Sequence, residues 1–168
     1  MPLSQPMTKR DGTITIKDAT GSPITCTVQY EDGDLSIEGI RYADRSKTAY
    51  LDRGTQYGLR EGDHQPVSFS FSAHLLELTD GTRKTIHDAA RKTGAFASGV
   101  STWGTNAADP WTLTVVFAVE GSDRGGDDET VTMTYCEIEV AVAEGDPTKI
   151  SVKGTAYPKD STSAVIVA

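Results

Sequence analysis

The sequence has little cysteine and histidine, and neither is spaced to hold a metal or a covalent framework. Cys26 and Cys136 are the two cysteines, and the histidines are His64, His74 and His87. None of the paired spacings that bind zinc, such as CxxC or HExxH, is present, and two cysteines do not make a disulfide framework. Each cysteine stands among β-branched and apolar residues, so we expect both to be small buried hydrophobic residues. We therefore expect no metal and no cofactor.

Long hydrophobic runs are also missing. No stretch approaches the about 20 apolar residues that span a bilayer. The N-terminal stretch MPLSQPMTKR carries no apolar core of a signal peptide. These features predict a soluble protein of a reducing compartment with no membrane contact.

Positive charge is in deficit, because 16 Lys and Arg stand against 24 Asp and Glu, a formal net charge of −8. Nucleic-acid phosphates are bound through concentrated basic surfaces, so this balance argues against such binding. It is compatible with a protein past which nucleic acid slides without sticking. The 168 residues suit one domain with its own core, and we expect residues 1–168 to form a single β domain.

The dominant pattern is a period-two alternation of apolar residues with Ser, Thr and charged residues, which is typical of half-buried strands. In the stretch 130–143 the apolar face changes from odd to even positions near Tyr135–Cys136, which indicates either a β-bulge or a strand that is buried differently along its length. Because short turns join the strands, we expect a mainly β protein, an antiparallel β-sandwich or barrel. The predicted strands are 12–17, 24–30, 66–78, 111–120, 130–143 and 150–157.

One segment has helical periodicity. Ile86, Ala89 and Ala90 share one face of the stretch 84–93, Thr85 can cap its start, and a glycine follows its end. We expect one α-helix that flanks the sheet and packs this apolar face against it.

The segment 41–58 has scattered apolar residues and charges of alternating sign. We expect a long projecting loop or hairpin, an arm that becomes ordered on assembly. Its mixed charges fit salt bridges across a protein interface better than a nucleic-acid patch. The candidate contact residues are Arg41, Asp44, Arg45, Lys47, Tyr50, Asp52 and Arg53.

The sequence offers no convincing catalytic set. Ser68, Ser70 and Ser72 share a strand face with His74, but such neighbours lie about 7 Å apart, too far for a direct hydrogen bond. No GxSxG elbow accompanies them. The acidic turn 121–129, GSDRGGDDE, lacks the ordered spacing of an EF-hand loop. We therefore expect no enzymatic activity.

The order of these parts carries a resemblance. A hairpin segment leads into a strand (51–75, LDRGTQYGLREGDHQPVSFSFSAHL). A short helix of IxDAxxxTG character (85–96, TIHDAARKTGAF) and a small-residue loop with a strand (100–121, VSTWGTNAADPWTLTVVFAVEG) follow before the long strand from Thr130. This order resembles the major tail tube proteins of long-tailed, siphovirus-type bacteriophages. Tube proteins of contractile phages and of type VI secretion share the architecture, and the sequence does not separate them.

The resemblance implies a β-sandwich with a flanking helix, assembled as hexameric rings that stack into the tail tube through the long loop. The joined inner sheets would surround a lumen through which viral DNA passes into the host without specific binding. The partners would be further copies of the chain and the tape measure, tail tip and terminator proteins. The protein would be a structural component of the virion tail, made in the bacterial cytoplasm.

Glu137 and Glu139 are the candidate lumen residues. They share one face of their strand, and the alternate residues from Cys136 to Val142 are apolar and expected to be buried. The carboxylates therefore face either bulk solvent or the lumen, where they would repel phosphates. As a pair of acids they could instead serve glycoside hydrolysis, although paired carboxylates on a strand are more often simply solvated.

A free-standing β-sandwich binding module is the alternative function. Examples are a tail-tip, decoration or carbohydrate-recognition domain. Such a module should expose clustered aromatic residues on loops, and Trp103 is the one tryptophan expected to lie in a loop.

Overall fold

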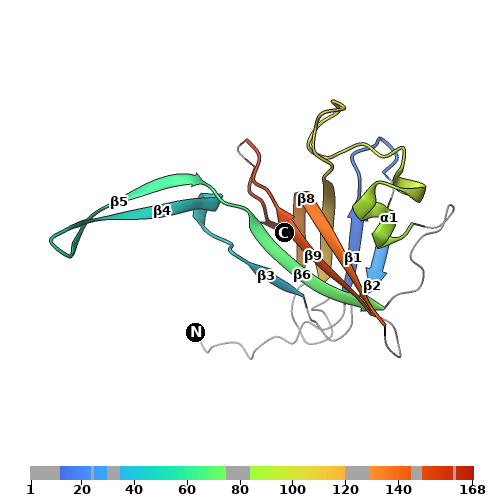
Figure 1. Cartoon of the computed structure of the whole chain (residues 1–168), viewed down its shortest axis with the longest axis horizontal. Coiled ribbons are helices and arrows are strands. Elements are labelled where there is room, and N and C mark those ends of the chain that lie inside the picture. The colour runs from blue at the N-terminus through green and yellow to red at the C-terminus, as the bar shows by residue number, and fades with distance from the viewer. Residues whose placement is uncertain are drawn as a thin grey trace.

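The structure is a computed structural model that describes residues 12–23, 25–29, 35–74, 84–119, 129–144, 149–160 and 162–168. In these residues one antiparallel sheet has the strand order β2-β1-β7-β8-β9-β6-β3, and β10 pairs with β8 (Figure 1). A separate hairpin consists of β4 and β5. The strands are β1 (Gly12–Lys17), β2 (Thr25–Gln29), β3 (Ser36–Glu38), β4 (Arg45–Asp52), β5 (Thr55–His64), β6 (Val67–His74), β7 (Leu113–Val119), β8 (Glu129–Ala143), β9 (Lys149–Ala156) and β10 (Ile166–Val167).

Side-chain alternation builds the core, as the sequence predicts. In β6 the residues Val67, Phe69, Phe71 and Ala73 are buried on one face. Alternate residues of β1, β7, β8 and β9 supply most of the rest of the same core. The predicted hairpin of the first two strands is confirmed by the pairing of β1 with β2.

The large sheet is curled rather than flat. The ring of Phe117 in β7 packs edge-on against Phe69 and Phe71 in β6, with centroid distances of 6.0 and 5.9 Å. Two strands lie between β6 and β7 in the sheet, so a flat sheet would hold them about 14 Å apart. The sheet therefore bends back on itself and encloses the core. The expected class, mainly β and antiparallel with a flanking helix, is confirmed, and the architecture is one curled sheet.

A bulge in β8 accounts for the change of apolar face. Leu113 pairs with Cys136 and Val115 with Met133, so one intervening residue of β7 faces two of β8. The extra residue lets both Met133 and Cys136 face the core, where they are fully buried. The predicted bulge is confirmed.

The helix α1 (Ile86–Arg91) begins where Thr85 caps it, because the Thr85 hydroxyl oxygen accepts a hydrogen bond from the Asp88 amide at 3.1 Å. The Asp88 carboxylate accepts the Thr85 hydroxyl in return, at 2.9 Å. Ile86 and Ala89 are buried, and Ala90 packs against the core.

This helix is shorter than the predicted 84–93. Its backbone turns left-handed at Lys92, with φ 54°, before the expected glycine is reached. A 3-10 turn, η2 (Gly94–Phe96), follows and buries Phe96. Another 3-10 turn, η1 (Tyr42–Asp44), precedes β4.

Gly154 in β9 tests the packing of the core against Phe69. It pairs with Phe69 on one side and with Ile138 on the other, and an added Cβ would overlap the Phe69 ring. We expect Gly154→Ala to lower the free energy of unfolding by about 1–3 kcal/mol in urea denaturation. Gly58→Ala is the matched control, because its added methyl group meets open space. Equal stability of the two variants would contradict this packing.

Candidate assembly surfaces

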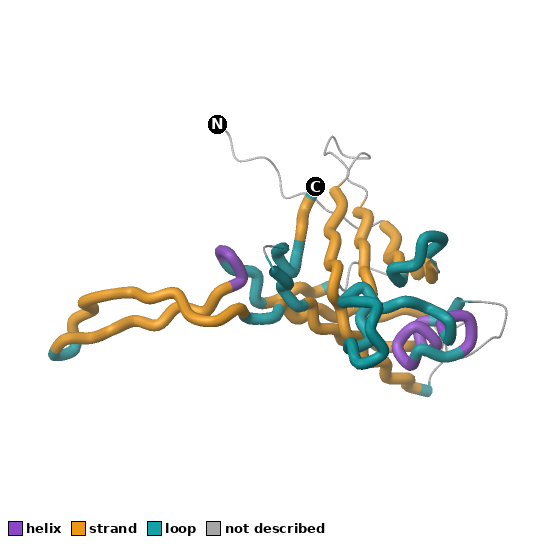
Figure 2. Tube along the Cα trace, turned by 90° about the horizontal axis from the view of Figure 1, so that it is seen from above, coloured by secondary structure: helices purple, strands orange, loops and turns teal. Residues whose placement is uncertain are grey.

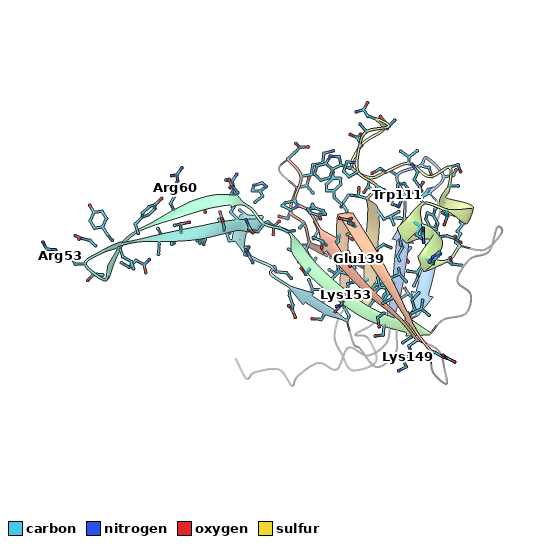
Figure 3. The ribbon with its side chains drawn as sticks, viewed as in Figure 1. Arg53, Arg60, Trp111, Glu139, Lys149 and Lys153 are labelled. Carbon is cyan, nitrogen blue, oxygen red and sulfur yellow. The ribbon has the colours of Figure 1, made fainter. Side chains whose placement is uncertain are left out.

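The half of the sheet made of β8, β9, β6 and β3 has a polar outer face. Its side chains form two cross-strand rows that run over all four strands, Glu139–Lys153–Ser70–Ser36 and Glu137–Thr155–Ser68–Glu38. They line a shallow hollow of about 500 Å³. Figure 3 labels Glu139, Lys153 and Lys149 along this half of the sheet.

The two predicted lumen carboxylates both point away from the core. Glu137 and Glu139 are exposed, and Ile138 between them is buried. The expectation that the opposite face is buried as far as Val142 is wrong, since Val142 is 45% exposed near the strand end. Tyr157 donates a hydrogen bond to Glu137 at 3.1 Å. Burial, and then this carboxylate, raise the pKa of the Tyr157 hydroxyl.

Sequence reasoning missed the lysines of this face. Lys149 and Lys153 alternate with the buried residues of β9, and Lys153 lies directly across from Glu139. With Glu38, the described charged residues on the face are three carboxylates and two ammonium groups. The face is therefore weakly acidic with both signs present, not lined by carboxylates and hydroxyls alone. The alternation of β9 was the signal that could have revealed it.

This half-sheet has a free edge at each end. β7 pairs with β8 as far as Cys136, and β9 pairs with β8 from Cys136 to Ala143. The stretch 137–143 thus has a strand partner on one side only, within the described part of the chain. At the other end, β6 is the one strand partner of β3 among the described residues. Each edge presents unpaired backbone N–H and C=O groups, a template for another strand.

The arm is the hairpin of β4 and β5, which extends far from the sheet (Figure 2). It runs to His64, past the expected limit of residue 58. A two-stranded hairpin alone is marginally stable in water, and this one exposes large apolar side chains. The exposed fractions are 48% for Tyr50, 67% for Leu51, 85% for Tyr57 and 59% for Leu59.

The predicted contact residues of the arm differ in exposure. Arg41, Lys47, Tyr50, Asp52 and Arg53 are exposed, and Figure 3 labels Arg53 at the outer turn, beyond Arg60. Arg45 is half-buried at the arm's base and donates a hydrogen bond to the Gly62 carbonyl at 3.4 Å.

Asp44 is a correction to this set. It is 4% exposed, and its carboxylate accepts a hydrogen bond from the Ala164 amide at 2.8 Å. Its own carbonyl accepts from the Gln65 amide at 2.6 Å. The left-handed backbone at Ala43 and Asp44, with φ of 51° and 48°, turns this side chain inward. Asp44 therefore anchors the base of the arm and is not available for contacts between copies.

An aromatic hollow of about 360 Å³ lies beside the free edge of β8. Trp111, labelled beside α1 in Figure 3, fixes one wall because its indole N–H donates to the Ala89 carbonyl at 2.8 Å. Lys159 lies over the rings of Trp103 and Tyr135, at 5.1 and 5.3 Å from their centroids, and fixes the other. The aromatic hollow is lined by Ala90, Trp103, Pro110, Trp111, Thr112, Leu113, Cys136, Glu137, Ile138 and Tyr157.

The described residues contain no group of three or more His, Cys, Asp and Glu that could hold a metal ion. Burial raises the pKa of the Cys136 thiol to about 12, so it stays protonated at neutral pH. The candidate cation turn 121–129 lies outside the described residues except for Glu129, and so does the side chain of His74.

No helix in the described ranges is long and apolar enough to cross a membrane.

Comparison with solved structures shows the fold. The chain is similar to a chain of the PVC sheath–tube complex in the extended state, from an extracellular contractile injection system. The TM-score is 0.56 at 11% identity, covering 99% of this chain and 93% of the other. It is also similar to a chain of the PVC sheath/tube terminator, with TM-score 0.57, 10% identity and 99% of both chains covered. No protein-family model and no curated protein matches the sequence.

The anchor of the arm generates a prediction. We expect Asp44→Ala to cost about 1–3 kcal/mol of stability, because the buried Ala164 amide loses its acceptor. Asp44→Asn keeps an acceptor oxygen and should retain most of this stability. Asp52→Ala, at an exposed position of the same hairpin, should change little in the same chemical denaturation. A loss in Asp44→Ala no greater than in Asp52→Ala would contradict the anchor.

Proposed function

We propose that the protein polymerises as stacked hexameric rings into the tail tube of a long-tailed bacteriophage and forms the conduit for DNA ejection. The observation that supports this proposal most is the half-sheet of β8, β9, β6 and β3, which has an unpaired edge at each end among the described residues. Its inner face is core and its outer face is polar. Such an open segment is the repeating unit that a closed, multi-chain barrel needs.

The strand directions support ring closure. All pairs are antiparallel, so β8 and β3 at the two edges run in opposite directions. A copy rotated about a tube axis would present its β3 antiparallel to the free stretch of β8, and the alternation would continue. Such a head-to-tail contact makes a ring when the rotation closes. The number six is what the resemblance to tail tube proteins implies.

The arm supports stacking of the rings. Its exposed tyrosines and leucines lack a core within the chain's described part, and aromatic residues with arginine are enriched at protein interfaces. We infer that the arm reaches a neighbouring ring. The two similar folds, which come from a sheath–tube complex and a sheath/tube terminator, support a role in a tail assembly.

The polar outer face would then line the lumen. Its hydroxyls and paired charges offer no broad basic surface, so DNA could pass without strong binding. The role is structural and non-enzymatic, in the virion tail. The proposed partners are further copies, the tape measure, the tail tip and the terminator.

Electron microscopy of the wild-type protein and of a variant with a shortened arm tests this function. The wild-type protein should form rings or tubes of constant diameter. A variant in which Asn-Gly replaces residues 48–60 should fold and form rings without tubes. Lys47 and Glu61 face each other in register, so a two-residue loop can join them, and Asp44 stays in place. Small featureless wild-type particles would favour the binding module instead, and normal tubes from the shortened chain would refute the stacking role of the arm.

The charge of the proposed lumen gives a second prediction. Glu137→Lys/Glu139→Lys would change the net charge of the described face residues from −1 to +3 per copy. We expect nearly unchanged monomer melting, because both side chains are exposed, and slowed DNA ejection from assembled particles. Glu137→Gln/Glu139→Gln should give an intermediate rate. If particles built from the Glu137→Lys/Glu139→Lys variant eject DNA at the wild-type rate, these two residues lie outside the lumen.

A further inference from the structure

The aromatic hollow exists because the pairing of β7 with β8 stops at Cys136, whereas β8 continues to Ala143. The last pair between them is Leu113 with Cys136, and the chain before Leu113 turns away along α1 and the loop of Trp103. From Glu137 to Ala143, β8 has no partner on this side in the part of the chain that the structure describes. The aromatic hollow therefore opens directly beside the start of the free edge of β8, where a joining strand from another copy would arrive.

A candidate occupant follows directly after β3, at the opposite edge of the half-sheet. Ile40 is 61% exposed and Tyr42 is 76% exposed. Gly39, with φ 91°, turns the chain out of the strand just before them. They precede the arm hairpin, which begins at Arg45, and the Lys47 ammonium of the hairpin lies 5.7 Å from the centroid of the Tyr42 ring.

The register of the half-sheet brings these two features to the same level. One cross-strand row joins Glu137, Thr155, Ser68 and Glu38. The C-terminal end of β3 thus lies level with the beginning of the free edge of β8. Rotation about a tube axis preserves this level between neighbouring copies. The strand tilt of a closed barrel shifts the register along the edge without reversing the direction.

We propose that Ile40 and Tyr42 of one copy fill the aromatic hollow of the next copy in the ring. The inference rests on the proposed function, since it needs β3 and β8 to join edge to edge. Arg41 lies between the two apolar residues and is exposed, and Glu137 lines the hollow. Arg41 therefore meets a carboxylate of opposite charge. Tryptophan, tyrosine and arginine are the residues that dominate the energetics of protein interfaces.

Cross-linking of assembled protein tests this contact. The double variant Ile40→Cys/Pro110→Cys places one thiol on the proposed plug and one at the exposed rim of the hollow. A short bis-maleimide should join neighbouring copies into a ladder that ends at the size of the ring. The wild-type chain and each single variant are controls for the native cysteines. Leu51→Cys/Pro110→Cys, with the first thiol on the arm, is the matched comparison.

The outcomes separate this inference from the proposed function. Rings by microscopy with a ladder only in the Ile40→Cys/Pro110→Cys variant support the plug. Rings in which the Leu51→Cys/Pro110→Cys pair cross-links instead would show that the arm occupies the hollow, which would overturn the inference. Rings without either ladder would also overturn it while leaving the proposed function intact. Failure of the wild-type chain to form rings would overturn both.

A single substitution measures the same contact without cross-linker. Ile40→Asp should raise the protein concentration needed for ring assembly at least tenfold, and Ile40→Val should leave it near the wild-type value. The melting temperature of the unassembled chain should be unchanged in both, because Ile40 is mostly exposed. An Ile40→Asp variant that assembles at the wild-type concentration would contradict the plug.

Discussion

The rest of the structure depends on β8, which pairs with a different strand along each of its two halves. Its first half pairs with β7 and its second half with β9, and the bulge opposite Leu113 and Val115 separates the two. Because one strand belongs to both halves of the sheet, the sheet bends around a single core and brings Phe117 against Phe69. Within the described ranges, the same division leaves the second half of β8 unpaired on one side.

The open strand edges and the projecting arm are each unfavourable in free energy for an isolated chain, and these are costs that assembly can remove. Unpaired strand edges invite association, and a two-stranded hairpin with exposed tyrosines gains little stability by itself. Both costs are removed if copies join edge to edge and the arm packs on a neighbour. In the proposed tube, a polar face with charges of both signs would then enclose the channel.

Local features could be predicted from the sequence because their causes are local. Alternation fixed the faces of the strands, the switch at Tyr135–Cys136 revealed the bulge, and Thr85 marked the start of the helix. Features that need distant partners could not. The inward turn of Asp44 depends on an amide 120 residues away, and the position of Lys153 opposite Glu139 depends on strand register. The aromatic hollow likewise arises only where β7 and β8 part.

Amide hydrogen exchange, compared between unassembled and assembled protein, tests the joining of edges most directly. The outward-directed amides of β3 and of residues 137–143 should exchange quickly in the unassembled chain. Assembly should protect both sets together, because each would supply the other's hydrogen-bond partners, while the central strand β9 should be protected in both states. Assembled protein in which these edge amides exchange as fast as in the free chain would contradict the account.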